Sequence, residues 1–83
     1  MNELPKGVPL TLEQAKQLES GTILNHSDAS KNADGTQARF KVTSVYTWKR
    51  DPGRIRIRVK RGLREHYTWD ETTFDYGEVV IQK

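Results

Sequence analysis

The sequence predicts a small, mostly β domain of five short strands with one short helix near its N-terminus. Apolar and polar residues alternate over several short stretches, which is the period of a strand with one buried face. Turn-forming residues separate these stretches. A chain of 83 residues allows a single domain, and its hydrophobic fraction of 34% is enough for a small core without a deep cleft.

The first ten residues are expected to be a flexible lead-in, because Pro5, Gly7 and Pro9 interrupt them and no hydrophobic period is present. The folded domain is therefore expected over residues 11–83. It begins with a short helix at about residues 11–20, where Thr11 and Gln14 have the spacing of a capping box. The apolar stripe of this helix consists of Leu12, Ala15 and Leu18. Two turns of helix are unstable alone in water, so the stripe must pack on the sheet.

Five strands are expected after this helix. They cover residues 22–26, 38–48, 54–61, 64–69 and 77–82. Residues 27–37 are polar and turn-rich, and Asp34-Gly35 predicts a tight turn within them. Residues 70–75 are expected to form a turn or a single helical turn with Asp70 as its cap.

The hairpin between the second and third strands determines which side chains share a face. Asp51-Pro52-Gly53 is the expected turn, because Pro fixes φ and Gly allows φ above zero. Trp48 would then pair with Ile55 or Ile57. The expected apolar face consists of Phe40, Val42, Ser44, Tyr46 and Trp48 of one strand and Ile55, Ile57 and Val59 of the other. Only an odd-length loop or a β-bulge would change this pattern. The residues expected to be buried are Leu18, Ile23, Phe40, Val42, Ile55, Ile57 and Val59.

The order of these elements favours a small, five-stranded, partly open barrel of the SH3-like kind with one short N-terminal helix. Four segments resemble those of small uncharacterised bacteriophage and prophage proteins. They are Leu12-Glu13-Gln14-Ala15, Gly21-Thr22-Ile23-Leu24, Asn32-Ala33-Asp34-Gly35-Thr36 and Thr47-Trp48-Lys49-Arg50-Asp51-Pro52. The resemblance covers roughly residues 11–66 and implies a phage or prophage origin, with no assigned activity.

The charge of the chain is concentrated in its middle third. The net charge is +3, yet residues 37–64 hold ten basic side chains and one acidic one, while the segments on either side are net negative. Within this third, residues 54–61 alternate basic and apolar side chains. A strand there directs Arg54, Arg56, Arg58 and Lys60 to one face, about 6.7 Å apart.

The basic alternation predicts a surface for an anionic partner. The neighbours expected from the second strand are Lys49, Thr47, Val45 and Thr43, give or take two residues, and none of the four is acidic. Like charges in a row repel one another, and the arginine fork suits phosphate. The alternative is a solvated face that resists edge-to-edge aggregation, with acidic side chains such as Glu65 or Glu78 folded over it.

Aromatic side chains flank the basic strand, and nucleic acid bases stack on exposed rings. These side chains are Tyr46, Trp48, Tyr67 and Trp69. Trp48, at the hairpin end, is the best candidate for an exposed ring. Tyr46 and Phe40 are expected in the core.

No pattern predicts a metal site, a cofactor or a catalytic centre. The chain has no cysteine and two histidines. Residues 30–35 imitate the start of an EF-hand loop, but Lys41 stands where the bidentate glutamate belongs. Because no apolar stretch is long enough to span a membrane and no secretory signal is recognisable, we expect no membrane partner and a cytoplasmic location in a bacterial host.

The sequence therefore predicts a non-enzymatic binding module that holds nucleic acid phosphates on a basic strand face. The residues expected to form the site are Trp48, Lys49, Arg50, Arg54, Arg56, Arg58, Lys60 and Arg61. Two alternatives stay open. One is a protein-interaction module that docks this face on an acidic surface of a host or phage protein, and the other is an enzyme without a recognisable signature. The oligomeric state is open as well.

Overall fold

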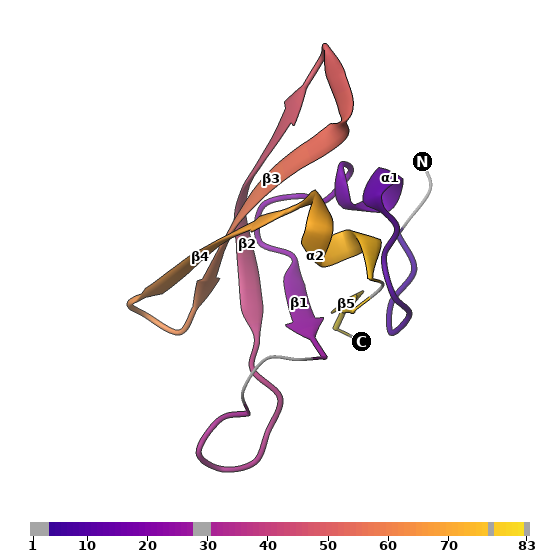
Figure 1. Ribbon diagram of the computed structural model, residues 1–83. Coiled ribbons are helices and arrows are strands. Elements are labelled where there is room, and N and C mark those ends of the chain that lie inside the picture. Colours follow the sequence, from indigo (N-terminus) through magenta and orange to yellow (C-terminus); the bar gives the residue numbers. More distant parts are fainter. Residues whose placement is uncertain (1–3, 28–30, 77, 83) are drawn as a thin grey trace.

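The computed structural model describes residues 4–27, 31–76 and 78–82. Its elements, shown in Figure 1, are α1 (Leu12–Ala15), β1 (Ile23–His26), β2 (Phe40–Trp48), β3 (Asp51–Arg61), β4 (Glu65–Asp70), α2 (Glu71–Asp75) and β5 (Val79–Ile81). The prediction of a mostly β chain with five strands is confirmed. The helical turn before the last strand is also confirmed, and the Asp70 side chain caps it by accepting the Thr72 N–H at 3.0 Å.

The five strands form one antiparallel sheet in the order β4-β3-β2-β1-β5. In this order β3 and β2 separate β4 from β1, yet the ring centroids of Trp69 in β4 and His26 in β1 lie 5.5 Å apart. The sheet must therefore be curved. In Figure 1 the β2–β3 hairpin extends beyond the body of the domain, and the two helices lie together beside β5. Most of β3 is thereby paired on both sides, while the end of its hairpin projects.

The first helix begins as expected and ends early. Thr11 and Gln14 form the capping box, with the Gln14 N–H donating to Thr11 Oγ1 at 3.2 Å and the Thr11 N–H donating to Gln14 Oε1 at 3.0 Å. The helix ends at Ala15 and not near residue 20, because the next backbone bonds close tighter i to i−3 turns. Ala15 and Leu18 are nevertheless buried, so the apolar stripe packs on the core.

The core is formed by side chains from the inner face of the sheet, both helices and the segment before α1. Its members are Leu10, Ala15, Leu18, Leu24, Ala38, Phe40, Val42, Ile55, Ile57, Val59, Phe74, Val79 and Ile81. Six of the seven residues expected to be buried are among them. Ile23 is the exception and is half-buried, because Leu24 takes the inward position in β1 and Ile23 pairs with Lys41 on the outward side.

Part of the expected lead-in lies against the last strand. The N–H groups of Gly7 and Leu10 donate to the carbonyls of Ile81 and Val79 at 2.9 and 2.8 Å, and Pro9 forms an isolated bridge with Val80. Leu10 is fully buried. The first three residues of the expected lead-in lie outside the described residues.

The polar loop after β1 contains the expected tight turn at Asp34-Gly35. Gly35 has φ +84, which glycine tolerates without the penalty that a Cβ brings. The Asp34 carboxylate accepts the hydroxyl and the N–H of Thr36, at 2.6 and 3.0 Å. These hydrogen bonds, the one from the hydroxyl first, lower the pKa of Asp34.

The turn of the β2–β3 hairpin lies at Lys49-Arg50, so the expected turn at Asp51-Pro52-Gly53 is wrong. Trp48 pairs with Asp51, and the register then shifts before Thr47 pairs with Ile55. The extra residues of β3 in this shift contact the rest of the fold, since Lys16, the C-cap of α1, donates to the Pro52 carbonyl. A tertiary contact therefore accommodates the Pro-Gly segment inside a strand.

A β-bulge at Thr43 changes the expected faces of β2. Val42 pairs with Val59, but the register shifts before Ser44, so that Val45 and not Ser44 faces the core side with Ile57. The Thr43 hydroxyl donates to the Arg58 carbonyl at 3.0 Å beside this shift. The expected register is wrong beyond Thr43, and Tyr46 lies 59% exposed on the outer face.

Candidate functional site

The outer face of β3 carries an uninterrupted row of cations. Arg54, Arg56 and Arg58 are exposed and Lys60 is half-buried, and we call these four side chains the basic row. They alternate with Ile55, Ile57 and Val59, whose side chains are buried. The alternation expected of this strand is thus confirmed, and the burial of its inner face keeps the basic row directed outward.

The neighbours of the basic row differ from those expected, because the bulge shifts β2. Arg56, Arg58 and Lys60 pair with Tyr46, Ser44 and Lys41 of β2. On the other side, the same three residues pair with Asp70, Thr68 and His66 of β4. Tyr46 and Ser44 therefore lie beside the row in place of the expected Thr47 and Val45, and Lys41, two residues from the expected Thr43, lies beside Lys60.

No carboxylate lies within the 4.0 Å ion-pair distance of the basic row among the described residues. Asp70, opposite Arg56, accepts the backbone N–H of Thr72 at the start of α2. Glu65 accepts the Tyr67 hydroxyl at 2.7 Å, and Glu78 lies 3.6 Å from His26. Glu65 and Glu78, the two acidic side chains that were candidates to cover the row, are thus engaged elsewhere.

An aromatic cluster adjoins the hairpin end of the basic row. The guanidinium carbons of Arg54 and Arg56 lie 4.5 and 5.5 Å from the ring centroid of Trp48. The Tyr46 ring meets that of Trp48 nearly at right angles, with centroids 4.7 Å apart. Trp48, the best candidate for an exposed ring, is half-buried, and Tyr46, expected in the core, is the more exposed of the two. Phe40 lies in the core as expected.

The remaining expected site residues lie at the two ends of β3. Lys49 and Arg50 form the exposed hairpin turn, beyond Trp48. Arg61 follows the alternation to the face opposite the basic row, and its Nη2 donates to Asn32 Oδ1 at 3.4 Å. The structure therefore groups Trp48 with the row, leaves Lys49 and Arg50 at the hairpin tip, and directs Arg61 toward Asn32, in the lining of a hollow at the far end of β3.

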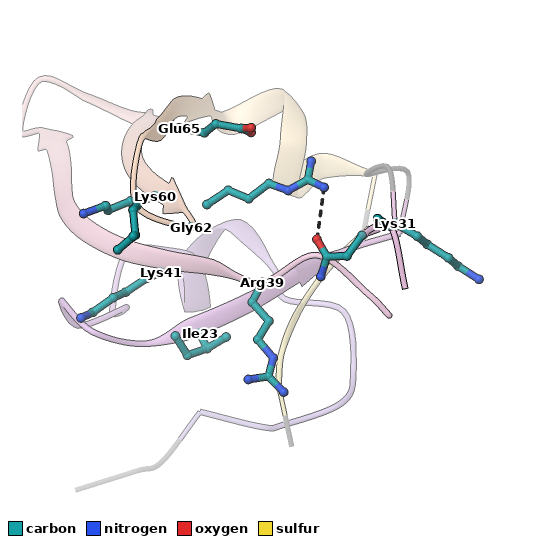
Figure 2. A pocket seen from close by; sticks show the side chains of 11 residues that line it. Ile23, Lys31, Arg39, Lys41, Lys60, Gly62 and Glu65 are labelled. Carbon is teal, nitrogen blue, oxygen red and sulfur yellow. Dashed lines mark hydrogen bonds between the residues drawn. The ribbon is translucent and has the colours of Figure 1, made fainter. Parts of the chain in front are cut away.

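An open hollow of about 720 Å³ continues the cationic surface at the far end of the row. Its basic lining residues are Lys31, Arg39, Lys41, Lys60 and Arg61. In Figure 2 the side chains of Lys41 and Lys60 extend in the same direction, whereas Lys31 extends away from them. Among the lining residues that the structure describes, the one acidic side chain is Glu65. The Glu65 carboxylate accepts the Tyr67 hydroxyl, and this hydrogen bond is the main cause of the raised pKa of Tyr67.

Arg39 and Lys41 were not among the expected site residues, although the sequence contains their signal. In the sequence, Arg39 and Lys41 alternate with three buried residues, Ala38, Phe40 and Val42. A strand that buries these even-numbered residues directs Arg39 and Lys41 outward. The place of Lys41 opposite Lys60 depended on the register of the β2–β3 ladder.

The described residues contain no group of three or more His, Cys, Asp or Glu side chains that could hold a metal ion. No helix in residues 4–27, 31–76 or 78–82 has the length and apolar character to cross a bilayer. Comparison with protein-family models, with curated proteins and with solved structures finds no match to this chain.

Proposed function

We propose that the chain is a non-enzymatic module that binds nucleic acid by holding phosphates on the basic row. The observation that carries the proposal is that Arg54, Arg56 and Arg58 project from one strand without a carboxylate within ion-pair distance in the described part of the chain. Their guanidinium groups keep their donors available, and each can donate two parallel hydrogen bonds to a phosphate.

The hollow and the aromatic cluster favour nucleic acid over an acidic protein surface. Lys41 lies opposite Lys60 in the ladder, so the cationic surface extends from β3 onto β2. The exposed ring of Tyr46 adjoins the same surface. A track of cations with an adjacent ring is the combination with which proteins bind the backbone and bases of a strand.

We also propose that the fold is a partly open barrel of the SH3-like kind. The sheet order, with β1 between β2 and β5 and a helical turn before β5, supports this proposal. The contact between Trp69 and His26 supports the required curvature. The phage or prophage origin implied by the sequence resemblance stays a prediction.

The proposal is tested by fluorescence anisotropy with labelled mixed-sequence oligonucleotides, single-stranded and duplex, at 50 mM salt. We expect binding that Arg58→Glu weakens, because the substitution removes a phosphate contact and adds a repulsive charge. Lys6→Glu is the matched control, since it changes the charge equally on the segment beside β5, where Gly7 bonds to Ile81. Its loss of affinity should be much smaller.

Absence of binding to either oligonucleotide by the folded wild-type protein would contradict the proposed function. A pull-down from a bacterial lysate, with and without nuclease, then identifies what replaces it. Capture of an acidic protein that survives nuclease treatment and is lost in Arg58→Glu would establish the protein-interaction alternative.

A further inference from the structure

Tyr46 lies on the outer face of the sheet and not in the core. Regular alternation from Phe40 and Val42 would turn it into the core, but the bulge at Thr43 turns it outward. Its side chain is 59% exposed. An exposed aromatic ring on a strand whose other face builds the core contributes little to stability, so its position calls for another role.

The ring of Tyr46 is held in a defined position. The centroids of the Tyr46 and Trp48 rings lie 4.7 Å apart, and the two ring planes are inclined at 79°. Trp48 is in turn fixed by the guanidinium of Arg54, 4.5 Å from its centroid, and by that of Arg56. Cation–π contacts of this kind restrain both partners, so the tyrosine stands on a preorganised support.

A phosphate on the basic row would lie next to this ring. Tyr46 is the direct cross-strand partner of Arg56, and their Cβ atoms are therefore about 5 Å apart. Arg58 follows one step further along the row. A nucleotide whose phosphate contacts Arg56 or Arg58 thus has its base within reach of the Tyr46 ring.

We infer that this face binds single-stranded nucleic acid and stacks one base on Tyr46, an inference that rests on the proposed function. In a duplex, both faces of each base are covered by neighbouring bases, so a surface tyrosine cannot stack on them. A single strand exposes its base faces, and stacking on aromatic rings accepts any base. The ligand class is therefore single-stranded DNA or RNA, with weak sequence preference.

The test compares three unlabelled competitors against one labelled single strand: the same strand, its duplex, and the same strand with abasic sites. Only the intact single strand offers a base for stacking. The wild-type protein should therefore bind the intact strand roughly 5- to 150-fold more tightly than the abasic strand. Tyr46→Leu should lose this advantage, whereas Tyr46→Phe should keep it. Tyr76→Leu, a change at another exposed tyrosine (73% exposed) at the end of α2, should behave as wild type.

A second readout follows the base directly. A single strand containing 2-aminopurine should lose fluorescence on binding to the wild-type protein and to Tyr46→Phe, but much less on binding to Tyr46→Leu. If duplex and abasic strands compete as well as the intact strand and Tyr46→Leu matches wild type, the stacking inference is overturned while phosphate binding stands. Absence of binding to all three competitors overturns both proposals.

Discussion

The two faces of β3 differ in burial and in charge. The inner face carries Ile55, Ile57 and Val59, each at most 1% exposed. The outer face carries the basic row, with no carboxylate at ion-pair distance among the described residues. The core face and the proposed binding face thus belong to alternating residues of one strand, and substitutions on one face should leave the property of the other unchanged.

The largest effect on stability is expected from the inner face. Ile57→Ala should lower the free energy of unfolding by about 2 to 4 kcal/mol, because it leaves a cavity in the centre of a small core. This is a large part of the stability of a domain of this size. Urea denaturation followed by tryptophan fluorescence measures it. A loss below about 0.5 kcal/mol would place Ile57 at the surface and invert the two faces.

A smaller effect is expected at the bulge that sets the faces of β2. Thr43→Val keeps the side-chain shape but removes the hydroxyl that donates to the Arg58 carbonyl at 3.0 Å. The free energy of unfolding should fall by about 0.5 to 1.5 kcal/mol, the usual net value of one hydrogen bond. Thermal and urea unfolding of the variant and the wild type provide the measurement. Unchanged stability would show that the bulge does not depend on this bond.

Sequence patterns predicted the features that depend on neighbouring residues. The capping box of Thr11 and Gln14, the Asp70 cap and the alternation within β3 each involve side chains only a few positions apart. The inner face of β3 could be recognised because its alternation is regular. The position and direction of the basic row followed from the same pattern.

The features that depend on contacts between distant segments were not predictable in the same way. The hairpin turns at Lys49-Arg50 and not at Asp51-Pro52-Gly53, because β3 begins earlier than expected and Lys16, the C-cap of α1, donates to the Pro52 carbonyl. The bulge at Thr43 leaves no local signal, since an outward Tyr46 and an inward Tyr46 fit the sequence equally well. Trp48, the best candidate for an exposed ring, is therefore half-buried, and Tyr46 is the more exposed of the two rings.

The smallest effect is expected away from both faces of β3, in the loop after β1. Hydrogen bonds from Thr36 lower the folded-state pKa of Asp34. The stabilisation they provide is present above the unfolded pKa and is lost as the pH falls through the lower folded value. An NMR titration of the Asp34 carboxyl should give a midpoint below the usual aspartate value, and Thr36→Ala should raise it. A midpoint at or above the usual value would show that the Thr36 bonds do not form in solution.

The salt dependence of oligonucleotide binding tests the central claim most directly. If about four cations contact phosphates, the logarithm of affinity for a single strand should fall with the logarithm of salt concentration at a slope of about −2.8. Arg56→Ala and Arg58→Ala should each flatten this slope by about 0.7 and leave the melting temperature nearly unchanged, because their side chains lie outside the core. Variants that bind with the wild-type slope, or a folded wild-type protein that shows no binding at 50 mM salt, would contradict the assignment of phosphate binding to the outer face of β3.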